Sequence, residues 1–291
     1  MSRKADIIST VILFILLFVG LSVMSYPSFS NWWNRRVQSR VVAGYQQKVA
    51  ELDNADIERM LEEARAYNNK LAAMSNPFSE SAKMPEYYSI LDVSGTGVMG
   101  YVTIPCINVE LPLYHGTSAE VLNIAAGHLE GSAFPVGGNN THAVISAHRG
   151  LPSAKLFTDL NKLVVNDIFT ITILNEVFTY EVEDILIVEP SELDKLAIIP
   201  DGDYVTLMTC TPYGINSHRL LVRSHRIETI YEHTVKVDPD ALKVDSMLVV
   251  PFIAAPFVII LVIFWFFSGS KGKMRTRKDY LNLVSPLKEV D

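Results

Sequence analysis

The chain is 291 residues long, 49% of its residues are hydrophobic, and its formal net charge is −7. The two ends carry about +1 (residues 1–26) and +3 (residues 268–291), which leaves about −11 for residues 27–246. This acidic middle offers no basic surface to neutralise phosphates, so the composition argues against a nucleic-acid partner.

Two uncharged apolar segments account for most of the hydrophobicity, residues 7–24 and residues 247–267. Each is long enough to cross a bilayer, and the second ends in an aromatic cluster suited to a membrane interface. A cleaved signal peptide is the alternative for the first segment. Residues 25–36 lack the small-x-small pattern that a signal peptidase requires, which favours an uncleaved anchor.

Basic residues predict the orientation in the membrane. A cluster of five follows the second segment: Lys271, Lys273, Arg275, Arg277 and Lys278. Because positive charge accumulates on the cytoplasmic side, we expect a cytoplasmic C-terminus and, with two spans, a cytoplasmic N-terminus. Arg35, Arg36 and Arg40 oppose this assignment. The balance predicts a multi-pass protein of the cell membrane with its middle region on the extracellular side.

Residues 37–74 have helical periodicity and predict two helices between the first span and the rest of the chain. Either Asp53 or Asn54 is suited to cap the second helix. The apolar residues that repeat at three-to-four spacing are Ile57, Met60, Leu61, Ala64 and Leu71. Residues 75–89 contain Pro77 and Pro85, and we expect a loop there.

From Gly100 the sequence predicts short strands. The expected strands are a pair around Pro105, one ending at His148, a hairpin within 168–189 turning near Asn175–Glu176, and a final pair at 204–210 and 218–228. Short helices are expected within 118–127 and 190–197. Because no alternating strand–helix–strand pattern occurs, the strands indicate a mostly antiparallel sheet or a closed barrel.

Cys210 is the candidate nucleophile, because it ends a strand at the rim of the predicted sheet. A thiol is mostly protonated at neutral pH and needs a nearby base or cation. His148 also ends a strand, and an arginine beyond the turn, either Arg219 or Arg223 on the same strand face, could stabilise an oxyanion. A thiol, an imidazole and a guanidinium together suggest acyl transfer.

Structural roles for the same residues stay open at this point. Cys210 could be a small buried side chain or could form a disulfide with Cys106, since extracellular thiols often pair. His148 could be structural, and the arginines could form a solvated edge strand. The cysteine and histidine spacings match no metal motif, and we expect neither a metal nor a cofactor.

Four stretches together resemble the class C sortases, the pilin-polymerising cysteine transpeptidases of Gram-positive bacteria. They are "GYVTIPCINVELPLYHGTS", "AAGHLEGSAFPVGG", "AVISAHRGLPSAKLFTDL" and "TLMTCTPYGINSHRLLVR", and the match covers roughly residues 95–230. The resemblance implies an eight-stranded sortase β-barrel. It also implies that Cys210 is the nucleophile, His148 the general acid/base and Arg219 the residue that stabilises the oxyanion or positions the substrate.

The resemblance further implies the reaction and its partners. Such enzymes cleave an LPxTG-like sorting motif after the threonine and pass the acyl group to a lysine amine of the next pilin subunit. Class C enzymes often carry a lid with an Asp-Pro-aromatic motif over the cysteine. The matching residues here are Asn76, Pro77 and Phe78, and asparagine in place of aspartate cannot form the same ion pair with Arg219. Cys106 is expected to be incidental.

The expected organisation is mainly β, with N-terminal helices and two flanking transmembrane helices. Two other functions remain possible: a sortase that attaches proteins to a peptidoglycan precursor, and a non-catalytic surface-binding barrel. The predicted segments are a tail and anchor (1–26), a helical spacer with the lid (27–95), the catalytic barrel (96–232), a linker (233–246), the second span (247–267) and a basic cytoplasmic tail (268–291).

Overall fold

The computed structural model describes residues 3–229 and residue 259. The chain divides into two compact units, residues 1–28 with 235–291 and residues 29–234. Apart from Ile259, the second predicted span lies outside the described residues. The barrel and everything around the candidate site belong to the second unit.

The N-terminal helix α1 extends from Arg3 to Ala50. Its portion from Ile12 onward is long and apolar enough to cross a membrane, with a mean hydropathy of 2.1 in a window that contains no buried residue. No other helix in the described part of the chain meets this test. The expectation of a separate helix after the first span is wrong, because residues 28–50 contain no proline to stop α1.

The second half of α1 packs against the barrel through one face. Val42, Tyr45 and Val49 are buried at three-to-four spacing, as expected for the apolar stripe of a surface helix. The Tyr45 hydroxyl donates to the Met99 carbonyl at 2.8 Å and accepts from the Leu174 amide at 2.7 Å. These two bonds fix the end of α1 to two different parts of the barrel.

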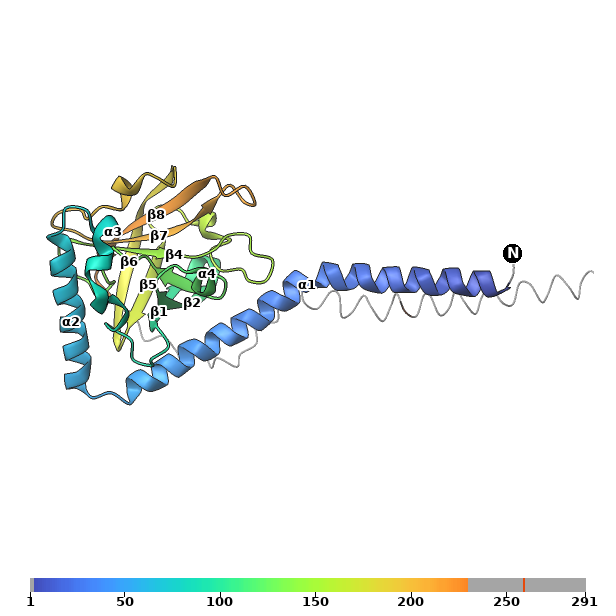
Figure 1. Ribbon diagram of the computed structural model, residues 1–291, viewed down its shortest axis with the longest axis horizontal. Helices are drawn as coiled ribbons and strands as arrows, with labels where there is room; N and C mark the ends of the chain where they lie inside the picture. The colour runs from blue at the N-terminus through green and yellow to red at the C-terminus, as the bar shows by residue number, and fades with distance from the viewer. Residues whose placement is uncertain (1–2, 230–258, 260–291) are drawn as a thin grey trace, which may run out of the picture. The chain divides into compact units, whose positions relative to one another are not determined.

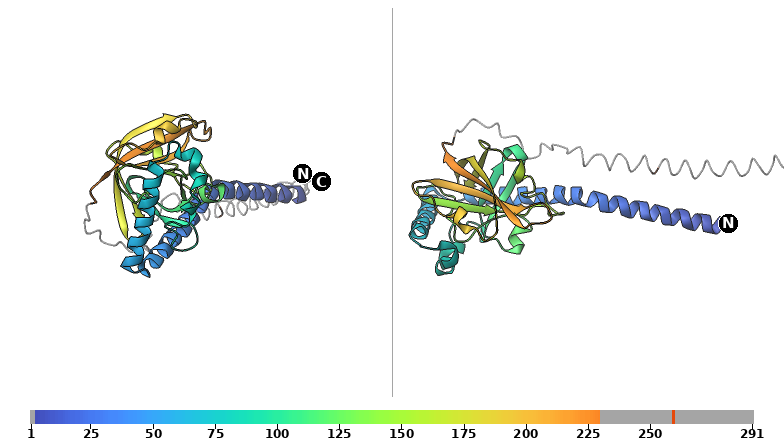
Figure 2. Two further views of the ribbon diagram at one scale, coloured as in Figure 1. Left: turned by 60° about the vertical axis from the view of Figure 1, so that its left-hand side comes forward. Right: turned by 90° about the horizontal axis from the view of Figure 1, so that it is seen from above.

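Helix α2 (Asn54–Ala72) begins at Asp53, whose side chain accepts from the Asp56 amide at 2.7 Å. This bond satisfies one of the free amides of the first turn and confirms that one of the two predicted residues caps the helix. Figure 1 shows α2 beside the barrel, and Figure 2 shows it standing against the strands. Its buried side chains include Ile57, Leu61, Ala64, Tyr67 and Leu71.

The segment after α2 is not the loop that its prolines suggested. It forms α3 (Pro77–Glu80), η1 (Ser81–Lys83) and η2 (Pro85–Tyr88). Each proline takes the first helical position, where its missing amide hydrogen is not needed and its fixed φ suits a helix. The prolines therefore start short helical turns here.

Eight strands close into a barrel in the order β1-β2-β3-β4-β7-β8-β6-β5. Their bounds are β1 Val98–Ile104, β2 Val109–His115, β3 Ala126–His128, β4 Thr141–Ser146, β5 Ile168–Ile173, β6 Glu176–Val188, β7 Asp203–Thr211 and β8 His218–Ile227. The mainly-β barrel is confirmed, and only the three-residue β3 is missing from the predicted strands. Two neighbouring pairs, β2–β3 and β4–β7, are parallel.

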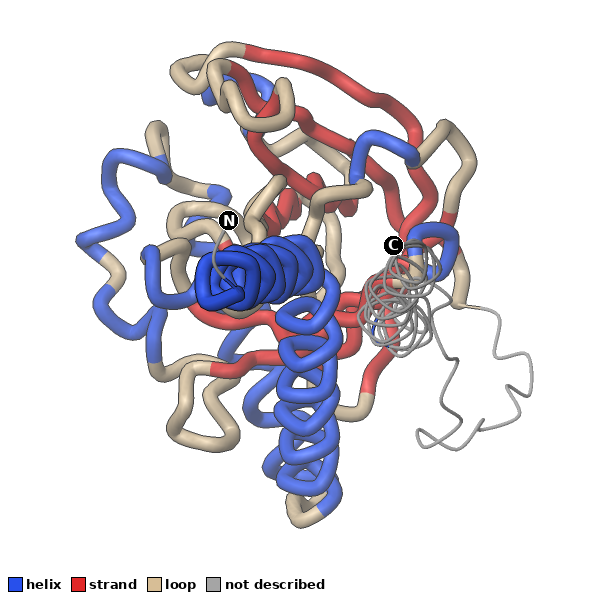
Figure 3. Tube along the Cα trace, turned by 90° about the vertical axis from the view of Figure 1, so that its right-hand side faces the viewer, coloured by secondary structure: helices blue, strands red, loops and turns tan. Residues whose placement is uncertain are grey.

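Short helical elements join the strands, as Figure 3 shows. They are η3 (Pro105–Ile107), α4 (Ala119–Leu122), η4 (Leu160–Lys162) and η5 (Leu193–Leu196). The predicted helices within 118–127 and 190–197 are confirmed by α4 and η5. The predicted hairpin is β5–β6, which turns at Leu174–Asn175.

The wall formed by β4, β7 and β8 has two apolar faces. Ile145, Leu207 and Val222 belong to the main core. Alternate residues face the other way and form a second cluster, which we call the outer cluster. Its buried members are Val144, Val188, Leu196 and Leu221, and Met208 and Phe78 pack against them. Since side chains alternate along a strand, every second residue from these positions faces the same side.

Candidate active site

Cys210 lies near the end of β7, directly opposite Arg219 in the antiparallel pairing of β7 with β8. Both residues are half-buried. Cys210 is two residues beyond Met208, and Arg219 is two residues before Leu221, so both lie on the side of the outer cluster. The pairing thus brings a thiol and a guanidinium to the same face of neighbouring strands.

His148 reaches the same level from the other side of β7. Strand β4 runs parallel to β7 with Ser146 opposite Met208, and the Ala147 amide continues the pattern by donating to the Met208 carbonyl at 3.2 Å. The Thr209 hydroxyl donates to the Ala147 carbonyl at 2.7 Å. The next residue in this register places His148 level with Cys210.

In this register the three predicted site residues lie at one end of three neighbouring segments, with Cys210 on β7 in the middle, Arg219 on β8, and His148 just after β4. The side chain of Ala147 belongs to the main core. Strand β4 ends at Ser146, two residues earlier than the sequence suggested. The bond from the Ala147 amide to the Met208 carbonyl nevertheless holds the residue before His148 against β7.

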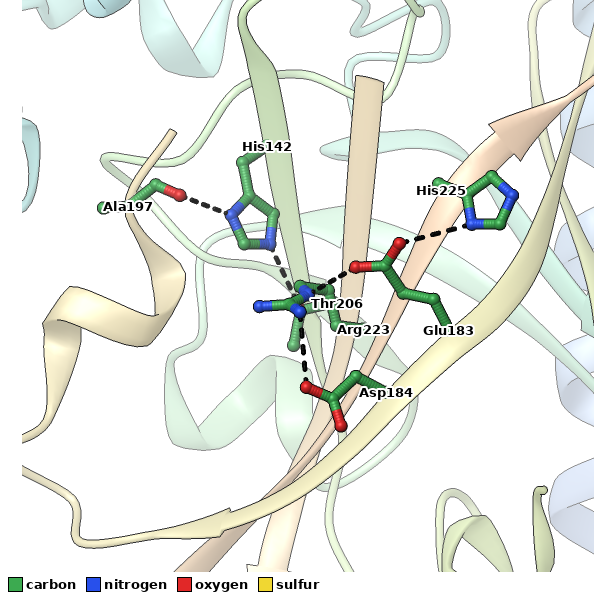
Figure 4. A network of polar contacts seen from close by, with 7 residues as sticks. All are labelled: His142, Glu183, Asp184, Ala197, Thr206, Arg223 and His225. Carbon is green, nitrogen blue, oxygen red and sulfur yellow. Dashed lines mark hydrogen bonds and ion pairs between the residues drawn. The ribbon is translucent and has the colours of Figure 1, made fainter. Parts of the chain in front are cut away.

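Arg223, the other candidate arginine, is occupied elsewhere. It pairs with Thr206, which lies four residues before Cys210 on β7. Its Nε donates to Glu183 at 2.7 Å and its Nη2 to Asp184 at 3.2 Å, as Figure 4 shows. Charge-assisted bonds of this kind fix a guanidinium in place.

Arg219 differs from Arg223 in its partners. Its Nη1 donates only to backbone carbonyls, those of Asn216 at 3.3 Å and His218 at 3.1 Å. It forms no ion pair with any residue that the structure describes. Position and free charge thus both distinguish Arg219 from Arg223 as a partner for Cys210.

Comparison with known proteins identifies the family. A family model for the sortase domain matches residues 102–227. The solved sortase C1 from Streptococcus agalactiae is 47% identical, with a TM-score of 0.61 over 66% of this chain and 100% of that chain. The chain belongs to the sortase family.

Further relatives place it within the family. A sortase C-1 from Streptococcus pneumoniae is 49% identical over 66% of this chain and 100% of its own, with a TM-score of 0.60. Among curated proteins, sortase D of Bacillus subtilis is 27% identical over 174 residues, which are 60% of this chain and 84% of that protein. The streptococcal structures assign this sortase to class C, a class of transpeptidases.

Two contacts of this sortase's site were not anticipated from its sequence. Arg149, which follows His148, donates from Nη1 to the Thr211 hydroxyl at 2.9 Å. Gly150 adopts φ +78°, and a Cβ there would lie 2.9 Å from a ring carbon of Tyr213. Both contacts join the loop after His148 to the turn after Cys210. In the sequence, only the position of Arg149 directly after His148 pointed to a contact of this arginine with the site.

Both cysteines of the sortase are free. Cys106 lies in η3 and is exposed, but partial burial of its thiol and the nearby Asp167 raise the pKa of that thiol. The alternative of a Cys106–Cys210 disulfide is therefore wrong for this structure. Cys210 is left as an unpaired, half-buried thiol beside His148 and Arg219.

Of the three predicted lid residues, Phe78 lies on the face of the sheet that carries Cys210 and Arg219. Phe78 packs against the outer cluster. In this cluster Met208 is two residues before Cys210 on β7, and Leu221 is two residues after Arg219 on β8. Gly131 allows this approach, because a Cβ there would lie 2.9 Å from the Phe78 Cα. Asn76 is the N-cap residue of α3 but makes no side-chain capping bond.

A groove of about 730 Å³ lies beside the lid residues. On one side it is lined by the end of α2 and by Asn76, Pro77 and Phe78, and on the other by Leu193–Pro200 of the β6–β7 connection together with Asn140. Among the described residues, no group of three or more His, Cys, Asp or Glu side chains could hold a metal ion.

Proposed function

We propose that this sortase polymerises pilin subunits through a thioester on Cys210. The thiolate attacks the threonine carbonyl of an LPxTG-like sorting signal, and the peptide bond to the following glycine breaks. His148 gives a proton to the leaving amine, which departs with the rest of the signal. The Arg219 guanidinium stabilises the negative charge on the threonine oxygen in the tetrahedral intermediate.

The second half of the reaction restores the enzyme. A lysine ε-amine of the next pilin attacks the thioester carbonyl, and an isopeptide bond forms as the carbon–sulfur bond breaks. His148 accepts the proton released by the amine, and the Cys210 sulfur leaves as a thiolate. One side chain thus serves as acid in the first half and as base in the second.

The alignment of Cys210 with His148 on one side and Arg219 on the other carries this proposal. Two solved relatives favour pilins as substrates: a 44%-identical sortase C1 belongs to GBS Pilus Island 1, and a 44%-identical pneumococcal sortase C is described in terms of pilin substrate specificity. In this proposal α1 is the membrane anchor, residues 247–267 form a second span, and the barrel works on the extracellular side.

The proposal is tested with full-length sortase in membranes, incubated with a pilin that carries an LPxTG-like signal. We expect a pilin ladder and, by mass spectrometry, an acyl group on Cys210, with both lost in Cys210→Ala. Transfer to a peptidoglycan precursor amine instead of a pilin lysine would redirect the assignment to cell-wall anchoring. An unacylated Cys210 in the presence of each substrate would support a non-catalytic barrel.

A further inference from the structure

Helix α1 contacts the loop that follows His148. The Ser30 hydroxyl and the Asn34 side-chain amide both donate to the Ser153 carbonyl, at 2.9 Å and 2.6 Å. The Asn31 side-chain oxygen accepts from the Lys155 amide at 2.9 Å. Three side chains on one face of the helix therefore bind the backbone of a segment about 120 residues away in the chain.

This segment is a closed loop that starts and ends at the candidate histidine. The Phe157 amide donates to the His148 carbonyl at 3.1 Å, and the Gly150 amide donates to the Thr158 hydroxyl at 3.1 Å. Phe157 is buried in the main core. We call residues 148–158 the His148 loop.

The His148 loop is held at two opposite places. Near its start, the Arg149–Thr211 bond and the contact of Gly150 with Tyr213 join it to the turn after Cys210. Near its middle, the backbone carbonyl of Ser153 and the backbone amide of Lys155 form the hydrogen bonds to α1. Loops are ordinarily the most mobile parts of a fold, so such bonds restrict where His148 can lie.

We propose that Asn34, with Ser30 and Asn31, positions the catalytic imidazole by fixing the His148 loop to the anchor helix. This inference rests on the proposed role of His148 as general acid/base. A misplacement of about 1 Å in a catalytic group can lower a rate by about 10²-fold, so small shifts of this loop affect the chemistry. α1 thus takes part in catalysis indirectly, in addition to its candidate role as an anchor.

Gln38 provides a matched control on the same helix. Its side-chain amide donates to the Ile124 carbonyl at 2.7 Å, a bond of the same kind one turn further along α1. Gln38 is buried, with only 6% of its surface exposed. Ile124 follows α4 and lies outside the His148 loop. Loss of the Gln38–Ile124 bond therefore tests the docking of the helix alone.

The experiment compares Asn34→Leu with Gln38→Met in full-length sortase. Both changes remove the amide and keep a side chain of similar size. The first readout is the rate and KM of acylation of Cys210 by a peptide with an LPxTG-like motif. The second is hydrogen exchange of the backbone amides in residues 149–158. For Asn34→Leu we expect a roughly 10-fold slower acylation at unchanged KM and faster exchange in the loop, and for Gln38→Met neither change.

Each contrary result has one meaning. Normal acylation in Asn34→Leu, or an equal loss in Gln38→Met, would overturn the positioning role. His148→Ala is measured in parallel: if it keeps full acylation, the proposed function itself fails. If His148→Ala abolishes acylation and Asn34→Leu does not affect it, only the inference about α1 is wrong.

Discussion

Cys210 and Arg219 are direct partners across the pairing of β7 with β8, whereas Arg223, on the same face of β8, is held by Glu183 and Asp184. The two arginines are alike in sequence context and differ in their surroundings. Arg219 makes no ion pair among the described residues and lies at the level of the thiol, whereas Arg223 is bound by two carboxylates four residues further along β8. We therefore propose the catalytic role for Arg219 and a structural role for Arg223.

Replacing Arg219 is expected to reduce activity without loss of stability. Arg219→Ala removes the proposed oxyanion partner, and loss of one such donor costs about 10²–10³-fold in rate. Its present bonds go only to the carbonyls of Asn216 and His218 in the adjoining turn, so the fold should tolerate the change. The single-turnover rate of acylation and the melting temperature, measured on the same preparation, check both parts.

Arg223→Ala is the control, and its expected effect is the reverse. It removes the guanidinium that pairs with Glu183 and Asp184 on a partly buried surface, and among the described residues leaves only His225, at 3.4 Å, beside Glu183. Leaving such groups unpaired lowers stability. A larger loss of acylation in a folded Arg223→Ala enzyme than in Arg219→Ala would contradict the assignment.

Phe78→Ala is expected to speed alkylation of Cys210 by iodoacetamide severalfold. Phe78 packs against the outer cluster, and we expect its removal to open an approach to the thiol on the same face of the sheet. The experiment uses a Cys106→Ser background, so that alkylation of the second free and exposed thiol, even if slow, does not add to the signal from Cys210. Tyr88→Ala is the matched control, since Tyr88 lies in the same segment, is 57% exposed and is not part of the outer cluster. An unchanged rate in Phe78→Ala would refute the lid.

Much of this arrangement follows from local sequence patterns. Alternating apolar residues predicted seven of the eight strands, and turn residues near Asn175 predicted the β5–β6 hairpin. The strand ends at His148 and Cys210 marked the candidate site, because the ends of strands project side chains from the rim. Periodicity and turn chemistry are local properties, and one sequence is sufficient to read them.

The remaining features depend on contacts between distant segments. Arg219 and Arg223 have the same parity, and only the register of β8 against β6 and β7 separates them. The pairing of β4 with β7, which aligns His148 with Cys210, joins strands about 60 residues apart. The contacts of Asn34 with Ser153 span 119 residues. No local pattern encodes such distances.

Cys106→Ser is expected to leave the rate of acylation unchanged. Cys106 lies in η3, makes no disulfide and has its thiol pKa raised by burial and by Asp167. A thiol with a raised pKa is a poor nucleophile at neutral pH. Thiol titration of the native enzyme should count two free thiols, and loss of acylation in a folded Cys106→Ser enzyme would contradict this prediction.

Stability is expected to fall as the pH drops from about 6.5 to 4, in part because of His128. Burial lowers the pKa of His128 from its ordinary value of 6.5 to about 4, an effect only partly opposed by its bond to the Ala133 carbonyl. In the unfolded chain the imidazole takes up a proton near pH 6.5, whereas in the folded protein it stays neutral until about pH 4. The stabilisation is therefore fully present above pH 6.5 and is lost on acidification across this window, at about 1.4 kcal/mol per pH unit and roughly 3 kcal/mol in total.

Urea denaturation followed by near-UV circular dichroism at pH 7.5, 5.5 and 4.5 measures this loss of stability. His128→Gln should be less stable at pH 7.5 and should show a shallower fall, while the buried His142, whose pKa is also lowered by burial, continues to contribute in the same direction. An equally steep fall in His128→Gln would show that the slope comes from other groups.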